Sequence, residues 1–162
     1  MSFSVLMVCT GNICRSVMAE QILREAAADS GVDILVDSAG ISDEEHGHGI
    51  DSRAARALRE GGYRVPSHRA RQVQAGELQH WDLILAMTSS HLRALERLAG
   101  GPDPKIRMFR DFEAAAGKPA RGGSRDVPDP WYGDYSDFEA TRETIEKCIP
   151  AILEYAVGSL NR

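Results

Sequence analysis

Residues 5–16 read VLMVCTGNICRS, an apolar run followed by a short loop of small and polar residues. The run at 5–8 is typical of a buried parallel strand, and residues 18–28 predict a helix. The first N–H groups of a helix have no intrahelical partners and lie at its electropositive end. A strand that leads into a helix through such a loop therefore predicts an anion site.

Three side chains in this stretch would make the anion site reactive. Cys9 ends the strand, where the loop N–H groups and the helix dipole stabilise a thiolate. Arg15 offers a planar guanidinium that fits two phosphate oxygens, and Ser16 can donate a hydrogen bond to the sulfur. The predicted phosphate loop between them consists of Thr10, Gly11, Asn12, Ile13 and Cys14. This arrangement predicts attack of a thiolate on a cradled phosphate.

Each of these residues also has a simpler interpretation. A Cys at a strand end is usually an inert apolar residue, and an Arg at a helix start is usually solvated. The combination at this spacing favours chemistry, and Gly11 and Asn12 support it because they tolerate the positive φ that a nest of N–H groups requires. No Gly-Lys-Ser or Gly-Lys-Thr follows, which excludes a nucleotide-binding P-loop.

The composition is that of one globular domain spanning residues 1–162, with 43% hydrophobic and 27% charged residues. A formal net charge of −5 argues against nucleic acid as a partner. The sequence has no long apolar run and no signal peptide, and its three Cys form no disulfide framework. We therefore expect a cytoplasmic protein, with export that needs no signal peptide left open.

Further apolar runs predict three more strands, at 34–36, 83–87 and 106–109. Helical segments separate them, which is typical of an α/β fold around a parallel sheet. Residues 114–125 are expected to form an irregular surface loop. Pro150 should bend or restart the last helix. The expected helix starts are Asp51 or Ser52, Thr88 or Ser89, and a capping box at 136–139.

Cleavage of a phosphoester by a thiolate needs an acid for the leaving group and then a base for water. Asp129 is the leading candidate, because Pro130 holds its backbone extended and the apolar faces of Trp131 and Tyr132 would favour its protonated form. An Asp-Pro pair is often only the start of a turn. The competing carboxylates are Asp126, Asp134 and Asp137.

Four segments, in this order, resemble the low molecular weight protein tyrosine phosphatases, in particular their bacterial branch. They are VLMVCTGNICRSVMAE at 5–20, DSAG at 37–40, SHRARQ at 67–72 and DPWYG at 129–133. The resemblance implies a single-domain three-layer sandwich, with a four-stranded parallel sheet of order 2-1-3-4, helices on both faces and a phosphate-binding loop after strand 1. It also implies phosphotyrosine-containing proteins as partners, no metal or organic cofactor, no membrane or nucleic acid, and a monomer or weak dimer.

The resemblance also assigns roles to the candidate residues. Cys9 would be the nucleophile, Arg15 would bind phosphate with the loop N–H groups, and Asp129 would act first as acid and then as base. Ser38 and His68 align with a network that supports the loop through Asn12. From sequence alone, Ser38 can also be a loop cap, and for His68 an ordinary surface histidine is the favoured interpretation.

The remaining Cys and His residues are assigned less specifically. Cys14 resembles the second loop thiol of the family, which implies a reversible disulfide between Cys9 and Cys14; otherwise it is a small core residue. Cys148 is expected to be buried on the last helix. The other histidines, which show no metal-binding pattern, are His46, His48, His80 and His91.

Three positions concern substrate choice. Ile13, which precedes the second Cys, accompanies phosphotyrosine hydrolysis in this superfamily, whereas Thr accompanies phosphoarginine hydrolysis. Val17 replaces the usual Pro, at a small cost in rigidity. Glu44 stands where family members usually place Tyr or Trp, on a cleft wall opposite Trp131 and Tyr132. A carboxylate supplies no π-face and adds negative charge beside a dianionic substrate.

We therefore expect a protein tyrosine phosphatase that works through a cysteinyl-phosphate intermediate. The alternatives are a phosphoprotein-binding module with little turnover, and arsenate reductase or phosphoarginine phosphatase chemistry on the same cradle. Intact Cys9, Arg15 and Asp129 argue against a module that only binds. Arsenate reductase needs resolving thiols near the third strand, and residues 82–98 contain no Cys.

Overall fold

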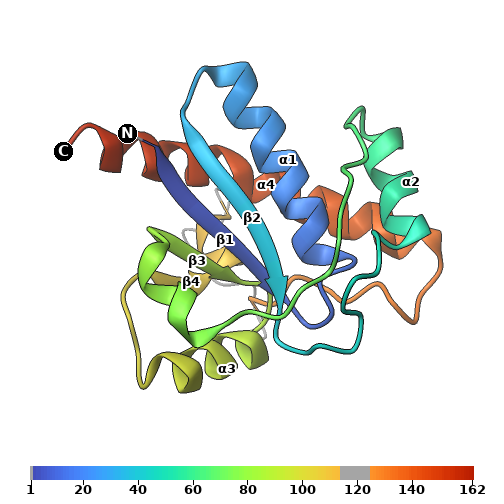
Figure 1. Ribbon diagram of the computed structural model, residues 1–162. Coiled ribbons are helices and arrows are strands. Elements are labelled where there is room, and N and C mark those ends of the chain that lie inside the picture. The colour runs from blue at the N-terminus through green and yellow to red at the C-terminus, as the bar shows by residue number, and fades with distance from the viewer. Residues whose placement is uncertain (1, 114–124) are drawn as a thin grey trace.

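A computed structural model describes residues 2–113 and 125–162 of the chain. Its centre is a four-stranded parallel sheet of order β2-β1-β3-β4 (Figure 1). The strands are β1 Phe3–Cys9, β2 Ile34–Gly40, β3 Leu83–Ala86 and β4 Ile106–Met108. The structure confirms the expected α/β class and the expected strand order.

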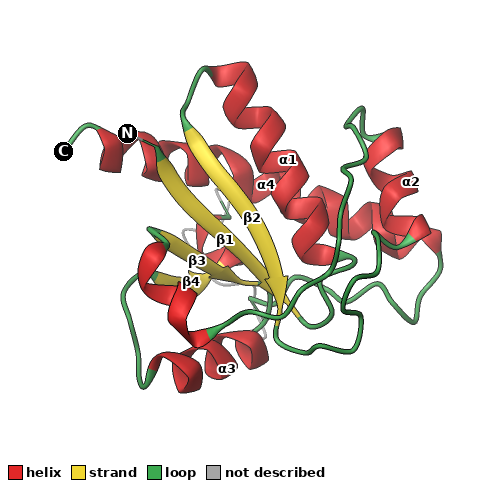
Figure 2. Ribbon diagram, viewed as in Figure 1, coloured by secondary structure: helices red, strands yellow, loops and turns green. Residues whose placement is uncertain are grey.

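Helices cover both faces of the sheet, which confirms the three-layer arrangement (Figure 2). α1 and α4 pack on one face, with α2 against α4, while α3 and a short 3₁₀ helix cover the other. The helices are α1 Arg15–Ser30, α2 Ser52–Glu60, α3 Ser89–Ala99 and α4 Tyr135–Leu160, with 3₁₀ helices at Ala75–His80 and Phe109–Phe112. Neither 3₁₀ helix was expected from the sequence.

The central strand β1 contributes to two separate apolar clusters. Val5 and Met7 join the cluster under α1 and α4, whereas Leu6 and Val8 join the cluster under α3. Because successive strand residues point to opposite faces, a strand buried on both sides must be continuously apolar. The same alternation places the side chain of Cys9 on the α1 side, at the carboxyl end of the strand.

β1 lies between β2 and β3, so the chain leaves it toward one edge of the sheet and later returns on its other side. This is the switch point at which open α/β sheets bind ligands. β2 extends to Gly40, four residues beyond the expected end, because residues 37–40 pair with β1 as far as Cys9. The end of β2 therefore lies directly beside the loop that follows β1.

The helix starts agree only in part with the sequence predictions. Asp51 caps α2 and Thr88 caps α3, both within the expected pairs. The capping box expected at 136–139 is wrong: Asp134 accepts from the N–H of Ser136, and Asp137 completes the box, because this loop offers several competing cap residues. The expected surface loop at 114–125 lies outside the described residues, apart from Arg125.

Pro150 lies inside α4, and the helix continues to Leu160. Of the two outcomes expected at Pro150, a restart is therefore excluded, and a bend stays a prediction. Ile149 and Ile152 on either side of it are buried in the core, and this packing holds the helix together where one backbone hydrogen bond is lost. In the part of the chain that the structure covers, no helix is both long and apolar enough to cross a bilayer.

Candidate functional site

The loop after β1 closes on a buried asparagine. Asn12 has φ of 62°, and no other non-glycine residue with a positive φ occurs at 2–113 or 125–162. Gly11, the other residue expected to need such a φ, does not adopt one. Its lack of a side chain matters for another reason: a Cβ atom here would lie 3.1 Å from Cγ of Glu45.

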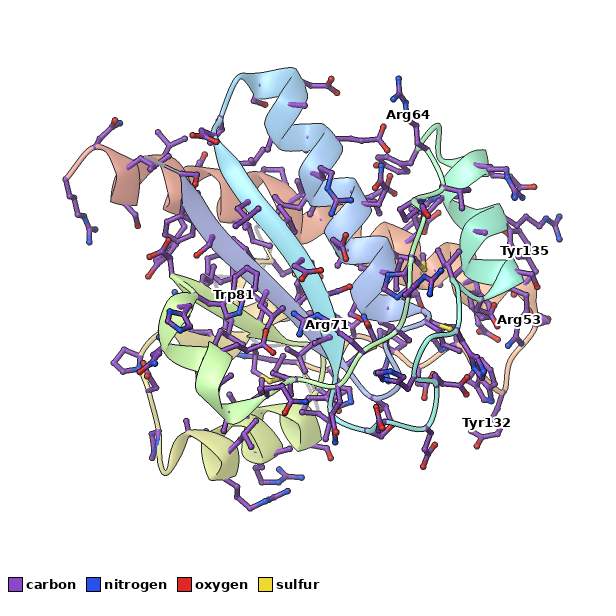
Figure 3. All side chains as sticks on the ribbon, in the orientation of Figure 1. Arg53, Arg64, Arg71, Trp81, Tyr132 and Tyr135 are labelled. Carbon is purple, nitrogen blue, oxygen red and sulfur yellow. The ribbon has the colours of Figure 1, made fainter. Side chains whose placement is uncertain are left out.

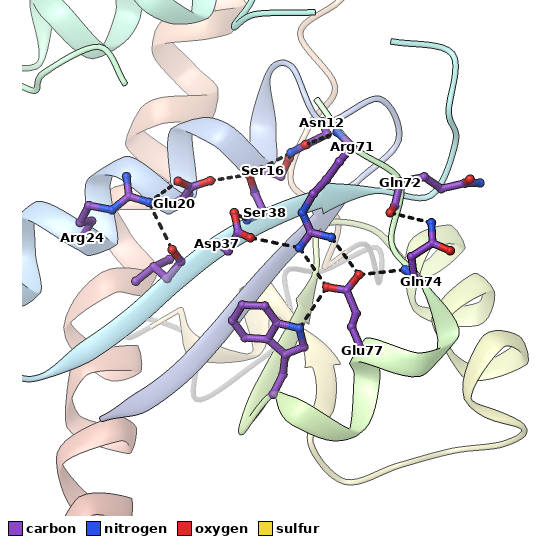
Figure 4. A network of polar contacts seen from close by, with 12 residues as sticks. Asn12, Ser16, Glu20, Arg24, Asp37, Ser38, Arg71, Gln72, Gln74 and Glu77 are labelled. Carbon is purple, nitrogen blue, oxygen red and sulfur yellow. Dashed lines mark hydrogen bonds and ion pairs between the residues drawn. The ribbon is translucent and has the colours of Figure 1, made fainter. Parts of the chain in front are cut away.

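The Asn12 side chain joins three segments that are far apart in the sequence (Figure 4). Its Nδ2 donates to Oγ of Ser16 and to Oγ of Ser38, both at 2.9 Å, and its Oδ1 accepts from the backbone N–H of Arg71 at 3.0 Å. Its backbone carbonyl accepts from Nε2 of His68 at 2.5 Å. Ser38 and His68 thus lie where the loop-support hypothesis requires, and the left-handed turn at Asn12 is held by partners on every side.

A second group of polar residues supports this network from behind, and sequence reasoning missed it. Ser38 donates through Oγ to Oε1 of Glu20 at 2.5 Å, and Glu20 pairs with Arg24 on the next turn of α1. The Arg71 guanidinium bonds to Asp37 and Glu77 (Figure 4), and the hydrogen bond to Glu77 raises the pKa of Arg71. No pattern in the sequence singled out Glu20, which is buried although it is charged.

Cys9 and Ser16 lie side by side within the loop. Cys9 Sγ lies 3.0 Å from Oγ of Ser16, and both residues are buried. Because Asn12 already donates to the Ser16 oxygen, the Ser16 hydroxyl hydrogen is free to point at the sulfur. α1 begins at Arg15 rather than Met18, so Ser16 lies in the first helical turn, where it faces the strand end.

Arg15 and Asp129 meet across the mouth of the loop. One guanidinium nitrogen donates to the carbonyl of Val127 at 3.1 Å, and the other lies 3.6 Å from Oδ2 of Asp129. The Arg15 side chain is only 6% exposed, whereas that of Asp129 is 51% exposed. Asp129 can therefore reach solvent and an entering substrate.

The competing carboxylates have other contacts. Asp126 accepts from the backbone N–H of Ser89 through Oδ1, while Asp134 and Asp137 form the cap of α4. None of the three lines the cleft that holds Cys9. The geometry thus favours Asp129 over the other acids that the sequence offered.

A cleft of about 210 Å³ opens above the loop. Two distant segments contribute to its lining, one with Glu44 and Glu45 and the other with Trp131 and Tyr132. The side chain of Tyr132 points away from the body of the protein (Figure 3) and is 94% exposed. The lining residues are Cys9, Thr10, Gly11, Ile13, Cys14, Arg15, Glu44, Glu45, Asp129, Trp131 and Tyr132. Asn12 and Ser16 belong to the loop but are fully buried, so they do not line the cleft.

Arg53 fixes the position of Trp131 from α2. Its guanidinium lies 5.0 Å from the centre of the Trp131 ring and donates to the Trp131 carbonyl at 3.0 Å. The same guanidinium lies over the ring of Phe138 at 4.6 Å. This contact ties Trp131, beside Asp129, to the helical layer, and no pattern in the sequence had indicated it.

Cys14 caps the start of α1 and lines the cleft, and like Cys9 and Cys148 it is a free thiol. Burial, followed by the charge of Asp51, raises the pKa of the Cys14 thiol far above its usual range, which keeps it protonated. Burial likewise raises the pKa of Cys148 to about 12. Cys148 lies in the core, as expected.

Two further residues contact the loop and were missed. His91, at the start of α3, hydrogen-bonds Oγ1 of Thr10 through Nε2 at 2.8 Å, and burial together with Arg15 lowers the pKa of His91 to about 4. Gly40 lies under the loop, and a Cβ atom there would be 2.6 Å from the carbonyl oxygen of Thr10. Both contacts join segments whose proximity only the folded chain reveals.

Across the described residues, no group of three or more His, Cys, Asp or Glu side chains is arranged to hold a metal ion. His46 pairs with Asp43, and His48 pairs with Glu45, both within the loop that follows β2. These pairs are local contacts three residues apart.

Comparison with known proteins gives a consistent result. A family model for low molecular weight phosphotyrosine protein phosphatase matches residues 4–161. A low molecular weight protein-tyrosine-phosphatase of Streptomyces coelicolor is 41% identical over 157 residues, 94% of this chain and 93% of the relative. A crystal structure of a protein tyrosine phosphatase from Entamoeba histolytica, with Hepes in the active site, has a TM-score of 0.85 at 28% identity and covers 98% of this chain and 99% of its own.

A further structure, of the YwlE arginine phosphatase with a phosphorylated active-site serine, has a TM-score of 0.81 at 25% identity and covers 94% of this chain and 95% of its own. Solved structures with this fold thus include both a protein tyrosine phosphatase and an arginine phosphatase. The match of the family model over nearly the whole chain confirms the resemblance inferred from the four sequence segments. This chain belongs to the low molecular weight phosphotyrosine protein phosphatase family.

Proposed function

We propose that the protein hydrolyses phosphotyrosine in proteins through a cysteinyl-phosphate intermediate. The observation that carries this proposal is the convergence of Cys9, Arg15 and Asp129 on one cleft, with Ser16 Oγ 3.0 Å behind the sulfur. Nucleophilic catalysis needs an activated nucleophile, and a phosphoryl group needs a positive cradle. The loop N–H groups and Arg15 provide that cradle.

In the first step, the Cys9 thiolate attacks phosphorus and the bond to the tyrosine oxygen breaks. Asp129, beside Arg15 at the cleft mouth, gives its proton to the departing oxygen. In the second step, the Asp129 carboxylate takes a proton from water as the water oxygen attacks phosphorus. The sulfur–phosphorus bond breaks, and the Ser16 hydroxyl stabilises the returning thiolate.

The tyrosine ester is favoured over other phosphoesters by the depth and lining of the cleft. Cys9 is buried, so a short phosphoserine side chain brings its phosphate to the sulfur less easily than an aryl phosphate does. Ile13 and Trp131 offer apolar surface to an aromatic ring. A phosphoarginine substrate remains the second candidate, because of the likeness to an arginine phosphatase. A pure binding module and an arsenate reductase receive no such support.

We further propose that the enzyme needs no metal or organic cofactor and works in the cytoplasm as a monomer or weak dimer. The three free thiols support a reducing compartment, because Cys9 must stay reduced to act. The net charge of −5 gives no support to a nucleic acid partner. Sedimentation velocity at several concentrations tests the proposed oligomeric state.

Hydrolysis of p-nitrophenyl phosphate, with and without EDTA, tests the mechanism. We expect full activity in EDTA, inhibition by vanadate, and loss of turnover in Cys9→Ser, since a serine hydroxyl here lacks a base. A metal requirement would contradict the mechanism. Matched peptides carrying phosphotyrosine, phosphoserine or phosphoarginine then test the substrate: the proposal requires phosphotyrosine to be cleaved with the highest kcat/KM.

A further inference from the structure

The loop between β2 and α2 carries two adjacent carboxylates, Glu44 and Glu45, which we call the acidic wall. The segment that holds them is fixed to the phosphate loop by backbone hydrogen bonds. The N–H groups of Ile41 and Ser42 donate to the carbonyls of Cys9 and Thr10 at 2.9 and 3.0 Å. The N–H of Gly47 donates to the carbonyl of Ala70 at 2.8 Å. The wall is thus held at both ends beside the reactive sulfur.

Glu45 is held more closely than Glu44. Its Cγ lies 3.1 Å from the position that a Cβ of Gly11 would occupy, so its stem packs on the phosphate loop itself. Nδ1 of His48 lies 2.6 Å from its Oε2, and the Glu45 side chain is 30% exposed. The packing of the stem beside Gly11 and the contact with His48 thus hold the Glu45 side chain at the cleft. Glu44 is exposed and lines the outer part of the same wall.

The charges that line the cleft are unbalanced for a phosphatase. Three carboxylates, of Glu44, Glu45 and Asp129, face it, and Arg15 is the one cationic side chain among the lining residues that the structure describes. A phosphate dianion gains from Arg15 and the loop N–H groups but is repelled by the wall. The repulsion is smaller when the substrate brings positive charges of its own to the rim.

We propose that Glu44 and Glu45 are specificity-determining residues that select phosphotyrosines flanked by Lys or Arg. The inference rests on the tyrosine phosphatase activity proposed above. A phosphotyrosine that enters to reach Cys9 leaves its neighbouring residues at the rim, where Glu44 is exposed. Long, flexible Lys and Arg side chains can contact the acidic wall from either side of the phosphotyrosine. Acidic neighbours would add to the repulsion.

The test uses three phosphotyrosine peptides of equal length whose flanking residues are Lys, Ala or Glu. Their kcat/KM values are compared for the wild type, the Glu44→Gln, Glu45→Gln double variant and the control Glu154→Gln. Glu154 is exposed near the C-terminal end of α4, next to Tyr155. The Tyr155 ring packs on Phe3, which lies at the opposite end of β1 from Cys9. The control removes a negative charge without touching the cleft.

We expect the wild type and the control to prefer the Lys peptide over the Glu peptide by about tenfold, mainly through KM. The double variant should reduce this ratio to about twofold, and 0.5 M salt should reduce the wild-type ratio as well. Equal rates on all three peptides in the wild type, or a ratio unchanged by the double substitution, would overturn the inference while leaving the phosphatase activity intact. Failure to cleave any of the three, with p-nitrophenyl phosphate still hydrolysed, would instead refute the phosphotyrosine proposal.

Discussion

The two segments that meet at the cleft are held in opposite ways. The phosphate loop at 9–16 is buried, and Asn12 at its centre is fully enclosed. It is hydrogen-bonded to Ser16 within the loop and to partners from two other segments, Ser38 on β2 and the stretch that holds His68 and Arg71. The segment at 126–134 that carries Asp129 is largely exposed. Transition-state stabilisation depends on donors fixed in advance, whereas a proton donor must accommodate substrates of different shape. The burial of the two segments thus matches the different demands that the proposed mechanism places on them.

The largest effect is expected at the exposed segment. Asp129→Ala should lower kcat for a phosphotyrosine peptide by about 10²–10⁴-fold, the usual contribution of general acid catalysis. For p-nitrophenyl phosphate the loss should be smaller, because its leaving group needs less protonation. Steady-state kinetics on both substrates checks this. The control is Asp126→Ala, which leaves Asp129 in the cleft. A larger loss in the control would transfer the acid role to Asp126.

The rigid loop should be the next most sensitive region. Asn12→Ala removes both donated hydrogen bonds and places a Cβ-bearing residue without compensating contacts at φ of 62°. We expect a loss of about 3 kcal/mol in the free energy of unfolding and about 10²-fold in kcat/KM. Asn12→Gly separates the causes, since Gly tolerates the backbone but restores no hydrogen bond. Wild-type activity in Asn12→Gly would show that the side-chain bonds do not position the loop.

His91 should make the stability of the loop region depend on pH. Its pKa in the folded protein is about 4, below the value of about 6.5 expected for the unfolded chain. The neutral form is therefore favoured by folding, and the stability it contributes is complete above pH 6.5 and is lost as pH falls toward 4. The loss over that window should be about 3 kcal/mol.

Urea unfolding from pH 7 to pH 4.5 checks the His91 prediction. His91→Gln should show a smaller fall in stability than the wild type, since Gln cannot be protonated there. His80→Gln, at an exposed position on the Ala75–His80 3₁₀ helix, should follow the wild-type curve. Parallel curves for wild type and His91→Gln would exclude His91 as the titrating group.

The smallest effect on turnover is expected at Cys14, although it lies inside the loop. Cys14→Ser should keep kcat within about twofold, because the raised pKa of this thiol leaves it protonated and uninvolved in attack. After exposure to peroxide, the wild type should recover activity with added thiol, since a disulfide between Cys9 and Cys14 stops oxidation at a reversible stage. The variant should recover less, and equal recovery would remove the redox role proposed for Cys14.

Much of the candidate site could be predicted from the sequence because the phosphate loop is one continuous stretch. Cys9, Arg15 and Ser16 are close in sequence, and the strand before them is marked by its apolar run. Glu20 and His91 could not be recognised, because a buried polar residue acquires its role only from a partner that folding brings near. The N-cap of α4 was misplaced for a local reason: Asp134, Ser136 and Asp137 are all good capping residues, and sequence alone does not choose among them.

Gly40 has a consequence for how this protein tolerates mutation. The phosphate loop crosses the end of β2 so closely that even a methyl group at position 40 would meet the Thr10 carbonyl at 2.6 Å and the Asn12 nitrogen at 3.2 Å. Position 40 has no chemistry of its own, yet in a library selected for turnover it should admit no residue but Gly. At Gly76 no atom lies within 4 Å of an added Cβ, so Ala should pass the same selection. Substitutions at position 40 would then inactivate the protein although Gly40 does not line the cleft.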